Sequence, residues 1–195
     1  MDVDKLISRR VRELRRSRGL SLEQLAERSG VSRSMISLIE RQETSPTAAV
    51  LNKLADALGV SLPGLFSHDA GADVKSPVSR HEDQAVWSDP ASGYVRRHLS
   101  PPGWGSRIEL VEVRFPASET VIFDNPVRSV ALHQQVWMLE GQMDITVADQ
   151  TWRIGLGDCL AMEYGERIVF HNPTNQQARY LLALTSNETT ARRAP

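Results

Sequence analysis

The chain has 195 residues, of which 41% are hydrophobic, and 23 Lys and Arg residues nearly balance 24 Asp and Glu residues. This composition excludes a disordered chain and leaves room for two globular domains. No apolar run precedes Arg9, so we expect neither a signal peptide nor a membrane-spanning helix, and Cys159 has no second cysteine with which to form an internal disulfide. The sequence therefore predicts a cytoplasmic protein that does not bind membranes.

Charge is distributed unevenly along the chain. Residues 1–60 contain 11 Lys and Arg against 8 Asp and Glu, whereas residues 61–195 contain 12 against 16. A basic N-terminal part favours contact with nucleic-acid phosphates. Of the arginines in a first predicted helix, at about 3–18, we expect Arg15, Arg16 or Arg18 to face phosphates; a solvated helix face is the alternative for each.

The most specific pattern is a pair of short helices joined by a glycine turn, in residues 19–42. Ser21 is placed to cap the first helix, and Gln24 three residues later completes a capping box. Gly30 ends that helix and Ser32 starts the next one. The arrangement is typical of a helix-turn-helix that reads DNA; a plain pair of helices with a solvated face is the alternative.

The second helix of this pair divides into a buried and an exposed face. The buried face is the apolar stripe of Val31, Ile36 and Ile39. The face that points outward is predicted to enter the major groove and carries Arg33, Ser34, Ser37 and Leu38. A guanidinium matches O6 and N7 of guanine, hydroxyls serve several bases, and an exposed leucine packs on a thymine methyl group. We therefore predict sequence-specific binding to double-stranded DNA.

Helical periodicity continues on both sides of the pair, over about 3–18 and 47–58, and apolar residues from Val60 to Phe66 are expected to close a five-helix core. The segments RGLSLEQLAERSGVSRSMISLIERQETSPT and ALGVSLPGLF make residues 5–67 resemble the lambda-repressor-like (Xre/Cro) helix-turn-helix family.

That resemblance implies a role for individual side chains. It places base contacts at Arg33, Ser34 and Ser37, whereas Leu38 stands where the family usually carries a polar or basic residue. The residues that it places against phosphates are Gln24, Ser32, Arg41 and Ser45.

Beyond residue 67 the pattern changes. Residues 68–84 lose all periodicity and are predicted to form a linker, and residues 188–195 a frayed tail. Between them, short strands alternate with turn residues, as in an all-β sandwich or barrel. Strands are predicted at 94–99, 108–115, 129–139, 143–147, 151–154, 168–171 and 179–184.

The run VWMLEGQMDITVADQTWRIGLGDCLAM, followed by VFHNPTNQQARYLLAL, resembles the double-stranded β-helix of the cupin superfamily over about residues 105–185. The predicted fold class is therefore α + β in two domains: a five-helix lambda-repressor-like domain (1–67) and an all-β cupin domain (85–187). The resemblance implies a regulator architecture in which the barrel senses a small molecule.

The barrel is not expected to hold a metal. Counting from Gly141 and Gly157, the positions that carry ligands in metal-binding cupins fall on Arg128, Val130, Gln134 and Ile168. A guanidinium has no lone pair to donate, a valine or isoleucine is apolar, and a glutamine oxygen is a weak ligand. We therefore predict no metal and no other cofactor.

One alternative metal site stays open. A shift of one residue in this count would favour a site built from His133, His171 and Glu163, although strand alternation places His133 on the opposite face from Gln134.

The same four positions, Arg128, Val130, Gln134 and Ile168, are the candidate effector-binding residues. Arg128 would bring a cation into the barrel, and a buried guanidinium needs an anionic partner. An anionic effector is one source of that partner; an ion pair with Asp124 or with a neighbouring subunit is the other. Gln134 is a hydrogen-bonding partner in either case.

We predict a ligand-responsive transcriptional regulator that binds a pseudo-palindromic operator as a homodimer, and not an enzyme. Cys159 is interpreted as a small buried hydrophobic residue rather than a nucleophile, because no His or Lys lies near it in the sequence to lower its pKa. Two alternatives remain: a metal-dependent cupin enzyme with an appended DNA-binding domain, and a constitutive, antitoxin-like DNA-binding protein.

Overall fold

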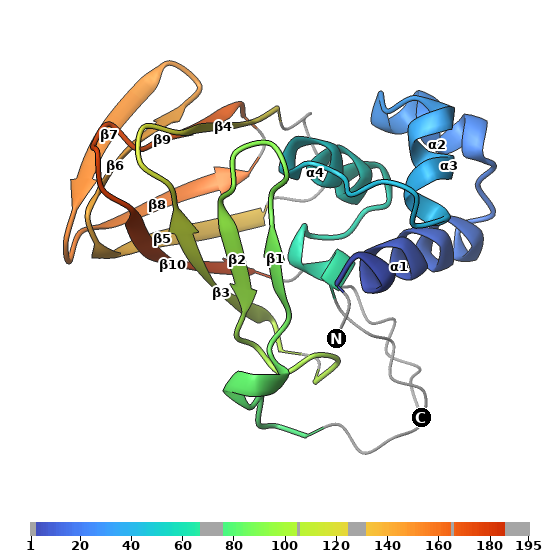
Figure 1. The fold of residues 1–195 in the computed structure, drawn as a ribbon, viewed down its shortest axis with the longest axis horizontal. Helices are drawn as coiled ribbons and strands as arrows, with labels where there is room; N and C mark the ends of the chain where they lie inside the picture. The colour runs from blue at the N-terminus through green and yellow to red at the C-terminus, as the bar shows by residue number, and fades with distance from the viewer. Residues whose placement is uncertain (1–2, 67–75, 105, 125–131, 165, 186–195) are drawn as a thin grey trace.

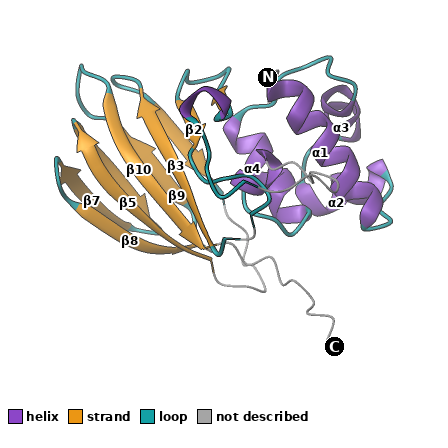
Figure 2. Cartoon of the chain, turned by 90° about the horizontal axis from the view of Figure 1, so that it is seen from below, coloured by secondary structure: helices purple, strands orange, loops and turns teal. Residues whose placement is uncertain are grey.

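The computed structural model describes residues 3–66, 76–104, 106–124, 132–164 and 166–185. These residues form a helical N-terminal domain and a strand-rich C-terminal domain, which lie side by side (Figure 1). Figure 2 shows the two sheets of the C-terminal domain stacked face to face, with the helices beside one end of the stack. The predicted tail, 188–195, lies outside the described residues, as do residues 68–75 of the predicted linker.

In the part of the N-terminal domain that the structure describes, residues 3–66, there are four α-helices and one short 3₁₀ helix. Their bounds are α1 (Val3–Ser17), α2 (Leu22–Ser29), α3 (Arg33–Glu40), α4 (Ala48–Ala57) and η1 (Pro63–Phe66). The predicted fifth helix is thus a single 3₁₀ turn, in keeping with the low α-helix propensity of Pro63 and Gly64. The predicted periodicity is confirmed, because the apolar residues of every helix meet in one core.

Side chains from all four α-helices are fully enclosed in that core. They include Ile7 and Val11 of α1, Leu25 of α2, Ile36 of α3 and Leu51 of α4, none of which exposes any surface to solvent. Burial of an aliphatic side chain of this size contributes about 1.5–3 kcal/mol each. Tertiary packing of this kind, more than intrinsic propensity, stabilises helices as short as α2 and α3.

The described residues of the C-terminal domain form ten strands. Their bounds are β1 (Val86–Ser88), β2 (Val95–His98), β3 (Ile108–Phe115), β4 (Thr120–Phe123), β5 (Leu132–Glu140), β6 (Gln142–Val147), β7 (Gln150–Gly155), β8 (Cys159–Tyr164), β9 (Ile168–His171) and β10 (Ala178–Thr185). All seven predicted strands have a counterpart among the described residues, although residues 129–131 of the strand predicted at 129–139 lie outside them, and β1, β4 and β8 are additional. β1 is only three residues long, too short for a periodic signal. A 3₁₀ turn, η2 (His81–Asp83), precedes them inside the predicted linker.

The strands form two antiparallel sheets. One has the order β1-β2-β3-β10-β5-β8 and the other the order β4-β9-β6-β7. Without the β1–β2 hairpin, each sheet has four strands that interleave along the chain, the jelly-roll order of cupin domains. Side chains alternate along β10: Ala178, Tyr180, Leu182 and Leu184 are buried between the sheets, and their neighbours are partly exposed. The predicted cupin-type fold is confirmed.

Gly141 occupies the sharp turn between β5 and β6. Its φ is +76°, a left-handed conformation, and a Cβ there would approach Cα of Ala178 to 3.0 Å. Both facts require glycine, because other residues disfavour this backbone and lack the space.

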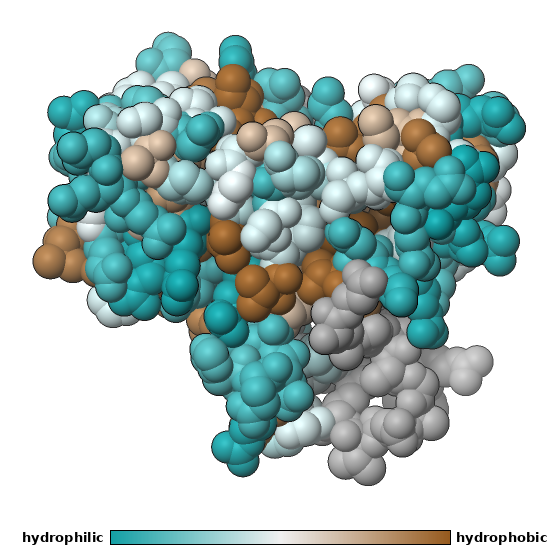
Figure 3. All heavy atoms as spheres, viewed as in Figure 1, coloured by the Kyte–Doolittle hydropathy of each residue, from teal (hydrophilic) through white to brown (hydrophobic). Residues whose placement is uncertain are grey.

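The two domains are in direct contact through the β1–β2 hairpin and β3. The backbone N–H of Ala48, at the start of α4, donates to Asp89 Oδ1 at 2.9 Å, and Ser61 Oγ donates to Glu109 Oε2 at 2.8 Å. Apolar residues, brown in Figure 3, gather along this junction, whereas hydrophilic residues cover much of the outer helical face. Among the described residues, no helix is both long and apolar enough to cross a membrane.

Candidate DNA-binding surface and barrel cavity

Helices α2 and α3 are held by the caps that the sequence predicts. Ser21 Oγ accepts from the backbone N–H of Gln24 at 3.1 Å, and Gln24 Oε1 accepts from the backbone N–H of Ser21 at 2.8 Å. Gly30 ends α2 with a φ of +66° and donates to the carbonyl of Ala26. Ser32 then caps α3 by accepting from the backbone N–H of Met35 at 3.2 Å. These local bonds fix the turn between the two helices.

The N-terminal half of α3 is exposed, as predicted for a recognition helix. Ser32, Arg33 and Ser34 are open to solvent, and Ser37 and Leu38 are half-buried. Arg33 forms an ion pair with Glu23 of α2. Hydrogen bonding to its own backbone, followed by attraction to Arg33, lowers the pKa of Glu23. Because both partners are exposed, the pair is weak, and Arg33 can leave it at little cost to contact a base.

The predicted phosphate-binding side chains lie on the surface around the same helix, each with an intramolecular bond. Gln24 carries the capping-box amide, Arg41 pairs with Glu43 at 2.9 Å, and Ser45 Oγ donates to Asp4 at 2.8 Å. Arg18 is exposed at the end of the first helical segment and donates to the carbonyl of Leu14. Their contacts with DNA stay predictions.

The expectation that Arg15 faces a phosphate is wrong. Its guanidinium is largely buried and binds both carboxylate oxygens of Glu40, with distances of 2.6 and 2.8 Å, and it also donates to the carbonyl of Leu20. The hydrogen bond with Glu40 raises the pKa of Arg15. Arg12 adds a hydrogen bond to the carbonyl of Glu40. This cluster fastens α1 to the end of α3, the predicted recognition helix, and so orients α3.

Arg16 differs from Arg15 in its exposure. It lies on the surface of α1 and lines a hollow of about 360 Å³ together with Arg9, Arg12 and Gln42. Two cations of this hollow are paired, Arg9 with Glu13 and Arg12 with Glu40. Arg16 therefore remains a candidate for phosphate contact.

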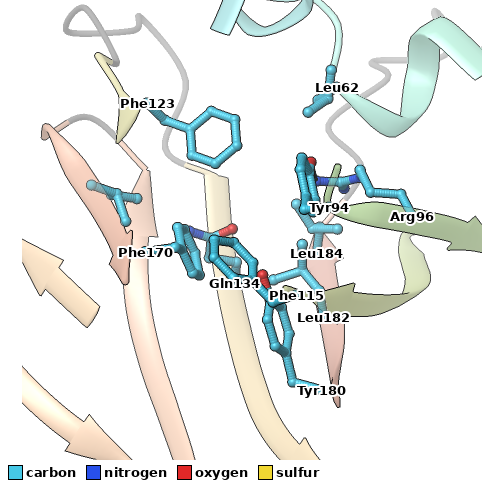
Figure 4. Close-up of a pocket in the computed structure, with 11 residues that line it drawn as sticks. Leu62, Tyr94, Arg96, Phe115, Phe123, Gln134, Phe170, Tyr180, Leu182 and Leu184 are labelled. Carbon is cyan, nitrogen blue, oxygen red and sulfur yellow. Dashed lines mark hydrogen bonds between the residues drawn. The ribbon is translucent and has the colours of Figure 1, made fainter. Parts of the chain in front are cut away.

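The barrel contains a small cavity between its two sheets (Figure 4). Its volume is about 20 Å³, and Figure 4 shows rings converging on it from both sheets. The described lining residues are Leu62, Tyr94, Arg96, Phe115, Phe123, Gln134, Ile168, Phe170, Tyr180, Leu182 and Leu184. The wall is therefore mostly apolar and aromatic, with a few polar groups, as is typical of small-molecule sites.

Two of these polar groups bring hydrogen-bond donors into the cavity. Arg96 exposes only 4% of its surface, and its Nη1 donates to the hydroxyl of Tyr94 at 3.1 Å. Gln134 is equally buried, and its Nε2 has no hydrogen-bond partner within the described parts of the chain. Burial raises the pKa of the Tyr94 hydroxyl, so this group stays neutral. The cavity wall thus presents a cation and an amide donor.

Of the four predicted effector residues, Gln134 and Ile168 line this cavity, and Arg128 and Val130 lie outside the described residues. Asp124, the predicted partner of Arg128, pairs with Arg167 at 3.5 Å. The sequence interpretation missed Arg96, because it lies on β2, ahead of the segment that resembles cupins. The alternation of Tyr94, Arg96 and His98 on one face of β2 was the available signal.

The alternative metal ligands do not come together. His133 Nδ1 lies 3.8 Å from Glu163 Oε1, but both side chains are exposed on the outside of the six-stranded sheet. His171 lies on the other sheet, where its Nδ1 is 2.9 Å from Thr120 Oγ1. Within the described ranges, no three metal-ligating side chains cluster. Strand alternation correctly places Gln134 inside and His133 outside.

Cys159 is exposed, and the expectation that it is buried is wrong. It pairs with Trp137 across strands β8 and β5, and both side chains point away from the barrel interior. A cysteine on the outward face of an edge strand packs against no second sheet.

An exposed, capped helix-turn-helix attached to a barrel with a small cavity between its sheets defines a two-domain DNA-binding protein. A family model described as Helix-turn-helix (HTH_3) matches residues 11–65. The HTH-type transcriptional regulator PuuR of Escherichia coli (strain K12) is 37% identical over 178 residues, which cover 91% of this chain and 93% of PuuR. The chain therefore belongs to the family of HTH-type transcriptional regulators.

Two further comparisons cover most of the chain. The HTH-type transcriptional regulator SutR of Escherichia coli (strain K12) is 24% identical over 176 residues, 90% of this chain and 92% of SutR. A crystal structure of an HTH_3 family transcriptional regulator from Vibrio cholerae superimposes with a TM-score of 0.73 at 23% identity and covers 94% of this chain and 96% of that one. The second likeness shows that both domains share their fold with a solved protein.

Proposed function

We propose that this transcriptional regulator binds a pseudo-palindromic operator as a homodimer, and that a small organic anion in the barrel cavity changes its affinity for that operator. Each chain carries one recognition helix, α3, with its N-terminal half exposed. One such helix reads one half-site, and half-sites of a dimer are spaced by about 34 Å per helical turn. A dimer therefore supplies the second helix at a fixed distance.

The buried Gln134 amide and the buried Arg96, which line the same cavity, carry the ligand proposal. A glutamine N–H group without a partner is costly inside an apolar cavity unless a ligand or a water molecule accepts from it. A carboxylate can accept from an amide and from a guanidinium together, and charge-assisted bonds of this kind are strong. The surrounding rings of Phe115, Phe123 and Phe170 favour a flat, apolar body. The ligand class is thus a compact aromatic carboxylate.

Calorimetric titration of the full chain tests this assignment. Benzoate is the probe, with benzamide as its neutral analogue and benzylamine as its cationic analogue. We expect benzoate to bind and the other two to bind at least about tenfold more weakly, because only the carboxylate pairs with the guanidinium. Equal binding of benzoate and benzamide, or no binding of benzoate, would refute the proposed ligand class.

A matched pair of variants assigns the effect to the cavity. Arg96→Met removes the buried guanidinium, and Arg97→Met removes its neighbour on β2, whose guanidinium bonds to the carbonyl of His81 on the surface. We expect only Arg96→Met to weaken benzoate binding, by about tenfold or more. Circular dichroism checks that both variants fold.

The DNA proposal is tested by selecting bound duplexes from a random pool. We expect an enriched sequence with two inverted half-sites, bound by two chains as measured by analytical ultracentrifugation. A single half-site bound by one chain would contradict the dimer.

We also propose that the barrel acts as a sensor and not as an enzyme. Gln134 and Ile168 occupy two positions at which metal-binding cupins carry ligands, and neither side chain is a good ligand. Titration of the purified chain with Fe²⁺, Mn²⁺, Ni²⁺ and Zn²⁺ tests this, because stoichiometric binding inside the barrel would favour the enzyme alternative.

A further inference from the structure

One wall of the barrel cavity comes from the DNA-binding domain. Ten of the eleven described lining residues belong to the C-terminal domain, and the remaining one is Leu62, in the turn that precedes η1. Leu62 exposes only 5% of its surface. In Figure 4 its side chain points toward the space above Tyr94 and Leu184, opposite the strand that carries Gln134.

The segment that carries Leu62 is attached to the barrel by aromatic contacts. The ring of Phe66 stacks on His98 of β2 with centroids 4.2 Å apart, and it meets Trp87 of β1 edge to face at 6.0 Å. Both partners belong to the hairpin beside the cavity. Movement of η1 would therefore move Leu62 and the rest of the helical domain together.

The cavity is too small for an organic ligand while Leu62 occupies this position. A volume of about 20 Å³ is room for one water molecule. Sites for small organic molecules are larger by about an order of magnitude. A ligand must therefore displace part of the wall, and ten of its residues are held in or next to hydrogen-bonded sheets. Leu62 belongs to neither sheet, and it is held by side-chain packing and by the hydrogen bond that the adjacent Ser61 donates to Glu109 of β3.

We propose that Leu62 is a plug, and that its insertion into the barrel and ligand binding exclude each other. A ligand in the cavity expels Leu62 and releases the DNA-binding domain from the barrel. Since a pair of recognition helices must match the spacing of two half-sites, release changes operator affinity. This regulation rests on the proposed function for the identity of the ligand, but the plug itself can be tested without any ligand.

A wedge inside the barrel tests the plug directly. Leu184→Trp places a bulky indole ring in the space that Leu62 fills, so we expect it to separate the DNA-binding domain from the barrel. Leu62→Gly combined with Leu184→Trp restores the space and should restore docking. Leu181→Trp, whose side chain lies on the outer face of the same strand, is the matched control. Leu184→Phe is a milder wedge for use if the tryptophan variant does not fold.

Docking is measured as a distance between two spin labels. The exposed Cys159 is the only cysteine and takes one label, and Glu27→Cys on the exposed surface of α2 takes the other. Labelled protein is mixed with a large excess of unlabelled protein, so that a dimer that contains a labelled chain contains only one. We expect one narrow distance distribution in the otherwise unaltered chain and in Leu181→Trp, and a broadened, longer distribution with the wedge.

Benzoate provides the second arm of the experiment. Saturating benzoate should broaden the distribution in the unaltered chain as the wedge does, and Leu62→Ala should bind benzoate at least about fivefold more tightly, because less docking must be undone. If the distance distribution stays narrow in a folded Leu184→Trp variant, the proposal that Leu62 is a plug is wrong. If benzoate binds and the distance between the two labels stays unchanged, ligand binding does not release the DNA-binding domain. The ligand-binding site is then supported, and its proposed effect on docking is wrong. If benzoate does not bind, the proposed ligand class fails, and the wedge still decides the plug.

Discussion

The carboxylate of Asp89, in the turn of the β1–β2 hairpin, accepts a hydrogen bond from the backbone N–H of Ala48, the first residue of α4, at 2.9 Å. Asp89 is 97% buried and also accepts from the N–H and the hydroxyl of Ser92. A carboxylate at a helix N-terminus is stabilised by the unpaired N–H groups and the helix dipole. The barrel thus supplies part of the cap of a helix in the DNA-binding domain.

Replacement of Asp89 should therefore destabilise the contact between the domains. We expect Asp89→Ala to lower the free energy of unfolding by about 1–3 kcal/mol, because buried N–H groups lose their acceptor. Denaturant unfolding measures the change, and Asp149→Ala, at an exposed aspartate, is the control. A loss no larger than that of the control would show that Asp89 contributes nothing to the junction.

Arg33 should determine recognition of one base pair. We expect Arg33→Ala to weaken binding to the selected operator by about 1–3 kcal/mol and to relax the preference at one position. Arg28→Ala, at an exposed arginine of α2, controls for the loss of one positive charge. Gel-shift titrations with the operator and with random DNA measure both affinities. An equal loss on the two duplexes would assign Arg33 to phosphate contact.

Arg15 and Arg16 are neighbours on α1, but we expect Arg15 to contribute to stability and Arg16 to contribute to DNA binding. Arg15→Met leaves the buried Glu40 carboxylate without its main partner and should lower the free energy of unfolding by about 3–5 kcal/mol. Arg16→Ala should leave stability almost unchanged and reduce the slope of log affinity against log salt by about 1. Unfolding curves and binding titrations at several salt concentrations separate the two roles. An unchanged salt slope for Arg16→Ala would remove it from the phosphate contacts.

Acidic pH should loosen the contact between His98 and Phe66. Burial, together with the nearby Arg96, lowers the pKa of His98 well below its ordinary value. The unfolded chain therefore takes up a proton first, so the contribution of His98 to stability is complete above about pH 6.5 and is lost as the pH falls toward the folded pKa.

The slope of this loss is at most about 1.4 kcal/mol per pH unit for one proton. His98→Phe keeps a ring against Phe66 and should flatten the dependence of stability between about pH 7 and pH 5. His81→Phe, at an exposed histidine of η2, is the control. Thermal unfolding over this range measures both. A slope that His98→Phe leaves unchanged would assign the pH dependence to other groups.

The sequence by itself determined the parts of this protein that depend on near neighbours in the chain. Ser21 and Gln24 cap each other three residues apart, Gly30 adopts the left-handed turn that it alone tolerates well, and β10 alternates with a period of two. Such signals act within a few residues, so the helix-turn-helix and most strands could be predicted from them, and the resemblance of residues 105–185 to cupins predicted the cupin-type fold.

Only the tertiary structure decided which distant side chains meet. Arg15 is buried because Glu40 lies beside it, Cys159 is exposed because its side chain is on the outward face of β8, and Leu62 reaches the cavity because η1 packs on His98. The contact of Arg15 with Glu40 joins α1 to α3 within the helical domain, whereas the position of Leu62 depends on how the two domains fit together. The local pattern of hydrophobic residues and caps does not specify how the two domains pack together, because many docking arrangements bury the same apolar faces.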